Sequence, residues 1–250
     1  MNDSYMNQVK TIKKKLIDIQ QDSISIPDDW DLSIYLNDDN ITYLAINHAH
    51  KEALWIDPVE EDFELLISES NSMKEYRFIG VIDTHTHADH LSCAGKLAHR
   101  LSTPLIMHRN APCSAVDLRV SNDTQLSTAS GPLKLLITTG HTWDGITPIW
   151  GPFIFTGDTI LYGDTGRDDL PTGNPEEHFK SLEKIKFNTS PNQVMLPGHD
   201  GAGGRASTWD HQLNINPSLT QSAADFIREA SAYLGPPPRL LKESLFHNFK

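Results

Sequence analysis

The sequence predicts an α/β fold in which helices cover β-sheets. Short apolar runs of strand length alternate along the chain with longer segments whose apolar residues recur at helical spacing. Strands and helices mix in this way when helices pack on the faces of a sheet. The chain of 250 residues is also long enough to bury a substantial core. We therefore predict an N-terminal extension over residues 1–30 and one domain over residues 31–250 that includes a short helical C-terminal tail.

The elements expected in the first half follow from local pattern. Four short apolar runs predict strands at residues 41–46, 53–57, 78–83 and 104–107. Residues 59–76 predict a helix, because Phe63, Leu66 and Met73 fall on one helical face. A second helix is expected over residues 92–101 for the same reason.

The second half repeats this arrangement. Apolar runs predict strands at residues 133–138, 152–156 and 193–196. Helices are expected over residues 176–186 and 220–234, and the three prolines at 236–238 indicate a stiff turn after the last of them.

Composition disfavours several classes of function. The formal net charge of −12 gives no electrostatic support for binding a phosphate backbone, so nucleic acid is not an expected partner. No apolar stretch approaches the roughly 20 residues of a membrane span, so no membrane partner is expected. The two cysteines, Cys93 and Cys113, provide no disulfide framework. We predict a cytoplasmic protein that acts on a small-molecule substrate, and we leave a homo-oligomer open.

The run THTHADH at residues 84–90 is the strongest functional signal. Directly after an expected strand it places, within six residues, His85, His87, Asp89 and His90. So many imidazoles and carboxylates are costly to bury without partners. Zinc and iron accept both types of ligand. The run therefore predicts a metal site in preference to a solvated loop rich in histidine.

Three more residues of ligand type follow expected strands in the same way. His141 comes after the run LKLLIT, Asp158 after PFIFT, and His199 after QVML. Loops at one edge of a sheet are where functional side chains are usually placed on a rigid scaffold. Because the pattern repeats at four strand ends, we predict that these residues join the THTHADH run in one metal centre.

The pattern HxHxDH, followed by H, D and H, resembles that of the metallo-β-lactamase superfamily over roughly residues 40–220. The resemblance implies a four-layer αββα sandwich with the metal site between the upper edges of two sheets. It also implies two divalent metal ions, zinc above all. By position, the first ion would be bound by His85, His87 and His141, and the second by Asp89, His90 and His199, with Asp158 bridging.

Hydrolysis is the chemistry expected of such a centre. Two neighbouring cations lower the pKa of a bridging water and so generate hydroxide at neutral pH. They also polarise a substrate carbonyl and stabilise the oxyanion that forms. We therefore expect a metal-dependent hydrolase that acts on a small thioester or ester, as glyoxalase II does. Asp89 is the candidate catalytic residue, because a carboxylate beside a metal-bound water can orient it or carry a proton.

The segment around and after Asp158 indicates a second enzyme class. FTGDTILYGDTGRDDL resembles the segment that glyoxalase II and persulfide dioxygenases have at this position. The tail over residues 207–220 resembles the end of the persulfide dioxygenases. This resemblance implies one iron, held by His85, His141 and Asp158, and glutathione persulfide as the substrate. An iron-dependent persulfide dioxygenase is therefore our alternative to the hydrolase.

Three positions depart from the pattern of that branch. Thr165 stands where the segment has Cys, Gly201 where a glutathione-contacting Tyr is expected, and Ser218 where an Arg lies near the substrate carboxylate. Losing an Arg removes a bidentate partner for an anionic thiol. These departures make hydrolysis the main expectation and weaken the expectation of glutathione recognition.

Two further residues have two interpretations each. Arg167 either contacts the substrate or supports the metal carboxylates, or else it pairs with Asp168 or Asp169. Trp143 either lines the pocket or packs as an ordinary aromatic side chain. A third hypothesis for the whole chain is a non-catalytic binding or sensing protein, and the complete set of metal ligands argues against it.

Overall fold

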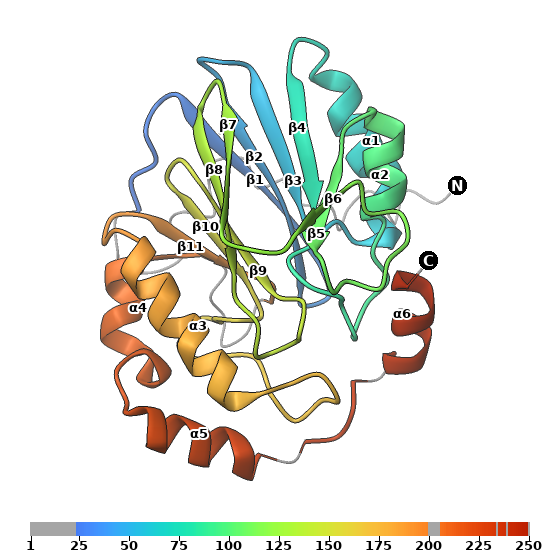
Figure 1. Cartoon of the computed structure of the whole chain (residues 1–250). Coiled ribbons are helices and arrows are strands. Elements are labelled where there is room, and N and C mark those ends of the chain that lie inside the picture. Colours follow the sequence, from blue (N-terminus) through green and yellow to red (C-terminus); the bar gives the residue numbers. More distant parts are fainter. Residues whose placement is uncertain (1–23, 200–205, 234, 239, 250) are drawn as a thin grey trace.

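The computed structural model describes residues 24–199, 206–233, 235–238 and 240–249. Two six-stranded β-sheets pack face to face, and helices cover both outer faces (Figure 1). The four-layer αββα sandwich predicted from the sequence is therefore confirmed. Most of the predicted N-terminal extension, residues 1–23, lies outside the described residues.

The first sheet comes from the N-terminal half, with its strands in sequence order. The first three strands pair antiparallel, and the next three pairings are parallel. The strands are β1 (Trp30–Asn37), β2 (Asn40–Asn47), β3 (Glu52–Ile56), β4 (Arg77–Ile82), β5 (Leu105–His108) and β6 (Leu118–Val120). Parallel neighbours need a crossover, and helices supply two of the three: α1 (Phe63–Ser72) between β3 and β4, and α2 (Ala94–Leu101) between β4 and β5.

The second sheet has the order β12-β11-β10-β9-β8-β7 and is antiparallel except between β10 and β11. Its strands are β7 (Thr124–Thr128), β8 (Gly131–Ile137), β9 (Ile146–Trp150), β10 (Phe153–Gly157), β11 (Val194–Pro197) and β12 (Ser207–Thr208). Three helices accompany it: α3 (Pro175–Asn188), α4 (Trp209–Ile215) and α5 (Ala223–Ala232).

Side chains of the central strands alternate between two apolar layers. In β3, Leu54 and Ile56 point into the core between the sheets, whereas Trp55 packs under α1 and α2. In β10, Phe155 lies in the central core and Ile154 packs toward α3. Both faces of these strands are buried, which explains why their sequences are apolar throughout.

All seven predicted strands are present, and the four predicted helices differ mainly at their ends. The helix predicted over 59–76 ends at Ser72, where the N–H of Tyr76 donates to the carbonyl of Met73 and closes a turn. The helix predicted over 92–101 begins only at Ala94, because the hydroxyl of Ser92 accepts the Ala94 N–H.

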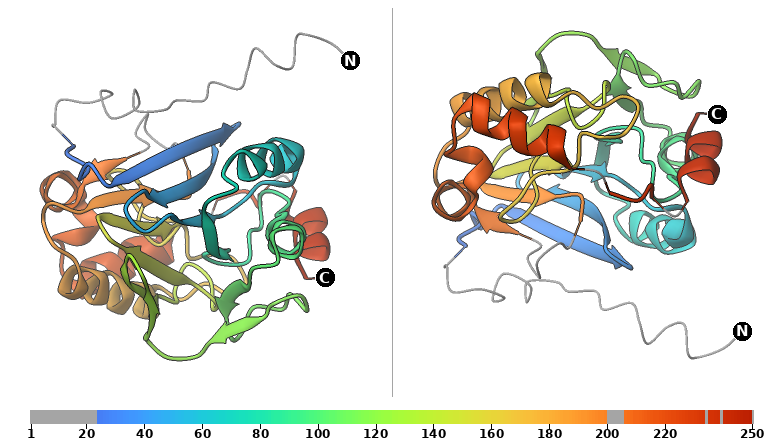
Figure 2. Two further views of the ribbon diagram at one scale, coloured as in Figure 1. Left: turned by 90° about the horizontal axis from the view of Figure 1, so that it is seen from above. Right: turned by 90° about the horizontal axis from the view of Figure 1, so that it is seen from below.

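The sequence analysis missed β1, β6, β7, β9, β12, α4 and α6, and several of these have a weak local pattern. Strands β6 and β12 are only 3 and 2 residues long, too short to show alternation. Strand β9 contains Pro148, which lacks a backbone donor and normally argues against a strand. The helix α6 (Leu241–Asn248) was also missed, and it lies on the side of α1 and α2, away from α3 and α5 (Figures 1 and 2).

In the described part of the chain, no helix is long and apolar enough to cross a membrane.

Glu52 joins the two sheets from a buried position at the start of β3. Its carboxylate accepts hydrogen bonds from the N–H of Ala129 (3.2 Å), the N–H of Ser130 (2.9 Å) and the hydroxyl of Ser130 (2.7 Å). Arg77 also donates to it. Burial by itself raises the pKa of Glu52, but these hydrogen bonds together outweigh burial and lower the pKa to about 2.

We expect Glu52→Gln to lower the free energy of unfolding by about 1–3 kcal/mol at pH 7, because an amide keeps only one acceptor oxygen for these donors. The folded pKa lies below the ordinary value of 4.5, so the carboxylate's contribution is complete above about pH 4.5 and is lost as the pH falls toward 2. Urea unfolding should therefore separate wild type and variant clearly at pH 7 and much less at pH 3. Glu75→Gln, at an exposed pair with Lys51, is the matched control and should unfold as wild type does at both pH values. An equal gap at both pH values would contradict this account.

Candidate metal centre

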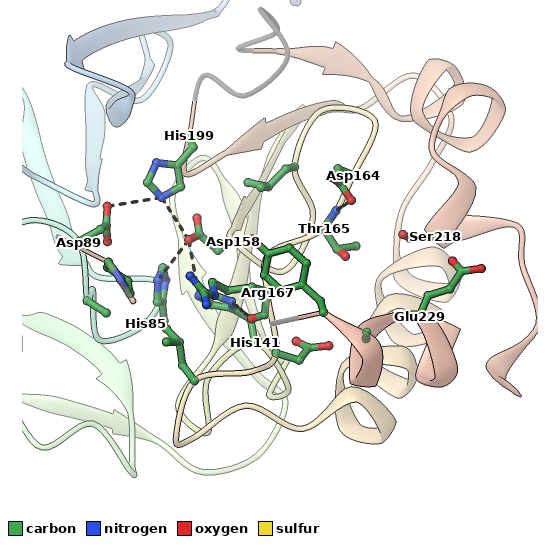
Figure 3. Close-up of a pocket in the computed structure, with 18 of the residues that line it drawn as sticks. His85, Asp89, His141, Asp158, Asp164, Thr165, Arg167, His199, Ser218 and Glu229 are labelled. Carbon is green, nitrogen blue, oxygen red and sulfur yellow. Dashed lines mark hydrogen bonds and ion pairs between the residues drawn. The ribbon is translucent and has the colours of Figure 1, made fainter. Parts of the chain in front are cut away.

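Four loops that follow strand ends bring the predicted ligands together at one edge of the sandwich. The THTHADH loop follows β4, His141 follows β8, Asp158 follows β10 and His199 follows β11. In Figure 3 the labelled side chains of His85, His141, Asp158 and His199 converge on one point, with Asp89 beside them. The placement predicted from the strand ends is thus seen in the structure.

His85, His141 and Asp158 form the first group of ligand-type side chains. The Asp158 Oδ2 atom lies 3.8 Å from His85 Nε2 and 3.5 Å from His141 Nε2. The three ligand atoms all lie within 4.8 Å of one another, and all three residues are buried. Two imidazoles and one carboxylate in this arrangement match the set that holds non-haem iron(II) in many oxygenases.

Hydrogen bonds orient both rings of this group. The carbonyl of Arg167 lies 2.7 Å from His141 Nδ1, so that nitrogen donates and Nε2 keeps its lone pair for a cation. The hydroxyl of Thr84 donates to Asp57 and therefore accepts from His85 Nδ1, 3.0 Å away. Burial lowers the pKa of His85 to about 3, which keeps its ring neutral as a metal ligand must be.

His87, Asp89 and His90 form a second group, also with ligand atoms within 4.8 Å of one another. The ring of His87 also lies beside that of His85, with the centroids 4.3 Å apart, so its assignment to the first ion stays a prediction. Its Nε2 faces Asp57 Oδ1 at 3.2 Å, which leaves Nδ1 for a cation. His90 Nδ1 lies 3.1 Å from Asp89 Oδ2.

His199 connects the two groups. Its Nε2 lies 3.2 Å from Asp158 Oδ2 and 3.5 Å from Asp89 Oδ2. Burial by itself lowers the pKa of His199, but the carboxylates of Asp158, Asp89 and Asp39 together outweigh burial and raise the pKa to about 10. The contact with His199, against the effect of burial, holds the pKa of Asp158 well below its ordinary value. Metal binding at these residues would therefore release a proton from His199.

Buried polar atoms without a hydrogen-bond partner test whether these residues fit a metal. They include Asp158 Oδ1 and His90 Nε2, one from each group. Such atoms cost free energy unless something satisfies them, and a cation between imidazole and carboxylate ligands does so. Gly198 keeps the approach open, because a Cβ there would lie 2.4 Å from Asp158 Oδ1. The residues present therefore fit a metal ion of the zinc or iron type.

Arg167 and Trp143 lie in different surroundings. The Arg167 guanidinium pairs with Asp169 through two contacts of 2.5 and 2.6 Å. It also donates to the carbonyls of Gly235 and Pro236. The pairing interpretation of Arg167 is therefore what the geometry shows. The side chain of Trp143 is 52% exposed and is not among the residues that line the cavity.

The metal-facing side chains open onto a cavity of about 540 Å³. Its wall includes the departing positions Thr165 and Ser218, together with Phe226 and Tyr233. Gly201 lies outside the described residues. Sequence reasoning did not identify Phe226 and Tyr233 as pocket residues, because a helical pattern does not say where a helix packs.

Asp57 is a supporting residue that sequence reasoning missed. Its carboxylate accepts hydrogen bonds from the Thr84 N–H (2.7 Å) and hydroxyl (2.9 Å) and faces His87. A signal was present, because Asp57 lies at the end of an expected strand, and the ligands were found just after strand ends.

Comparison with known proteins agrees with this geometry. Residues 57–199 match the family described as the metallo-beta-lactamase superfamily. The mitochondrial persulfide dioxygenase ETHE1 of Bos taurus is 27% identical over 202 residues, which cover 79% of this chain and 78% of that protein. Hydroxyacylglutathione hydrolase of Dictyostelium discoideum is 26% identical over 175 residues, covering 67% and 64%.

A solved structure extends the comparison to the fold. The crystal structure of ETHE1 from Myxococcus xanthus superposes with a TM-score of 0.80 at 27% identity, covering 87% of this chain and 97% of that chain. The family match runs from Asp57, beneath the metal-binding loop, to His199, which links the two ligand groups. It takes in more than half of the sequence, and the chain therefore belongs to the metallo-β-lactamase superfamily of metal-binding enzymes.

Proposed function

We propose that this protein is an iron-dependent dioxygenase that acts on the persulfide of a small thiol. The observation that carries the proposal is the group of His85, His141 and Asp158, which faces the cavity as two imidazoles and one carboxylate. Persulfide dioxygenases are among the relatives that match over about four fifths of the chain. This reverses the order of our two expectations from the sequence, in which hydrolysis came first.

The chain's own residues would hold the metal and arrange its surroundings. His85, His141 and Asp158 would bind one iron, which supplies the one-electron chemistry needed to use O₂. Arg167 positions His141 through its backbone carbonyl. Asp89 and His199 border the same cavity and are in contact at 3.5 Å, so they would form a proton-carrying pair beside a persulfide bound there.

The proposed reaction balances with O₂ and water as the co-reactants. The outer sulfur of RSSH gains the two atoms of O₂, and water cleaves the S–S bond, so that RSSH, O₂ and H₂O give RSH, sulfite and two protons. Sulfur is oxidised and O₂ is reduced, and the thiol leaves with one proton. The residues near the cavity then have to accept the two protons that are released.

The nature of the thiol is set by the cavity wall. Among the described residues that line the cavity, Arg167 is the one arginine or lysine. Its guanidinium already pairs with the Asp169 carboxylate. Asp164 and Glu229 add negative charge to the same wall. We therefore expect glutathione persulfide, which carries two carboxylates, to be a substrate of high KM.

Oxygen uptake by iron-loaded protein tests the proposal. We expect uptake with glutathione persulfide and with the persulfide of a neutral thiol, with one sulfite formed per O₂ consumed. The metal content should be about one iron per chain. Protein that holds about two zinc ions and consumes no oxygen with either persulfide would refute the proposal.

Hydrolysis of a thioester is the second candidate. It is favoured by the second ligand group, His87, Asp89 and His90, which is complete and buried enough to hold another ion. The relative in Dictyostelium discoideum is a hydroxyacylglutathione hydrolase. A panel of thioesters, esters and lactones run on zinc-loaded protein separates this candidate from the dioxygenase. A cytoplasmic location and a homo-oligomer stay predictions.

A further inference from the structure

We propose that Asn248, in the C-terminal helix α6, positions the loop that carries four of the metal-binding side chains. Its side-chain amide donates to the carbonyl of His87 (2.9 Å) and to the carbonyl of His90 (3.0 Å). Its oxygen accepts the N–H of Ser92 (2.9 Å). One side chain thus satisfies three backbone groups of the loop, from more than 150 residues away in the sequence.

The pattern of donors and acceptors specifies an amide at this position. The two carbonyls require N–H donors, and the Ser92 N–H requires an acceptor. Asparagine supplies two donors and one acceptor on a short side chain. Aspartate has nearly the same shape, but it would place an oxygen against the carbonyls of His87 and His90 and so repel them.

The network continues from Asn248 to the start of the same loop. The Ser92 hydroxyl donates to Asp83 Oδ2 at 2.7 Å, and Asp83 directly follows β4. Next to Asn248 on α6, His247 Nε2 lies 3.2 Å from the carbonyl of Ser92. Helix α6 therefore contacts the end of the loop and, through Ser92, its beginning.

The effect of Asn248 falls on the second ligand group more than on the first. Asn248 holds the backbone of His87 and His90, whose rings belong to the second group. In the first group only His85 shares this loop, whereas His141 and Asp158 follow strands of the other sheet. The carbonyl of Arg167 orients His141. Loss of Asn248 should therefore weaken the second position most, whichever reaction the enzyme catalyses.

Titration of metal-free protein with Co²⁺, followed by its visible absorption, tests the inference. Removing a residue that supports a metal ligand typically weakens binding about 10- to 100-fold. We expect a loss of this size for the weaker Co²⁺ site in Asn248→Ala and at least as large a loss in Asn248→Asp. Glu243→Ala, an exposed change on the same helix, is the matched control and should bind as wild type does.

Folding is measured beside binding so that the two effects are kept apart. Metal-free Asn248→Ala should keep its near-UV circular dichroism, while hydrogen exchange at the Ser92 amide becomes faster. Asn248→Ser, which keeps one polar group, replaces it in the titration if the alanine variant does not fold. Unchanged Co²⁺ affinity in a folded Asn248 variant would overturn the proposal. So would an equal loss in His247→Ala, because it would mean that docking of α6 as a whole matters and not the amide.

Discussion

Replacing Asp158 with alanine is expected to remove the metal from the first ligand group and to abolish activity. Asp158 Oδ2 lies within 3.8 Å of ring nitrogens from His85, His141 and His199, so its loss affects every ligand around it. Removing a residue that only supports a metal ligand weakens metal binding about 10- to 100-fold. Removing a direct ligand should weaken metal binding by more than this. Metal content measured by elemental analysis should fall below about a tenth of the wild-type value.

Glu229→Gln is the control for this experiment, because Glu229 is an exposed residue that lines the same cavity without belonging to either ligand group. It should keep its metal. An Asp158→Ala protein with full metal content and unchanged activity would mean that the centre lies elsewhere. If wild-type protein holds its metal but shows no activity in any of these assays, a binding or sensing protein would be favoured instead.

The second large effect is expected at His178, and it concerns stability. His178 is fully buried on α3, with Nδ1 2.6 Å from Asp168 Oδ1 and Nε2 2.7 Å from the carbonyl of Thr159. His178→Ala would leave the buried Asp168 carboxylate without this partner. Breaking a buried pair of this kind typically costs about 3–5 kcal/mol. Urea unfolding at pH 7 measures the loss.

Lys180→Ala is the matched control on the same helix. Lys180 pairs with Glu177 on the surface, where solvent screens the interaction, so this variant should unfold almost as wild type does. His178→Ala should also weaken metal binding, since the loop that it holds leads to Arg167, whose carbonyl orients His141. A loss of stability below about 1 kcal/mol would show that Asp168 finds another partner.

The sequence by itself predicted which residues of ligand type meet at one edge of the fold and which layers surround them. Ligands and strands are local signals: an apolar run ends, and His141, Asp158 or His199 follows within a few residues. Neighbouring strands of a sheet end at a common edge. Ligands that follow different strands can therefore be predicted to lie close together, even when they are far apart in the sequence. Helices α1, α2, α3 and α5 were located for a similar reason, since their apolar spacing is a property of neighbouring residues.

Only the tertiary structure decided how these residues are grouped and supported. It oriented His87 by placing its Nε2 against Asp57, and it paired Arg167 with Asp169. It also placed α6 against the THTHADH loop, where the Asn248 side chain donates to the carbonyl of His87. The physical reason is that these contacts join segments far apart in the chain through single hydrogen bonds. Such contacts leave no periodic trace in the sequence, unlike the burial of a strand or of a helical face.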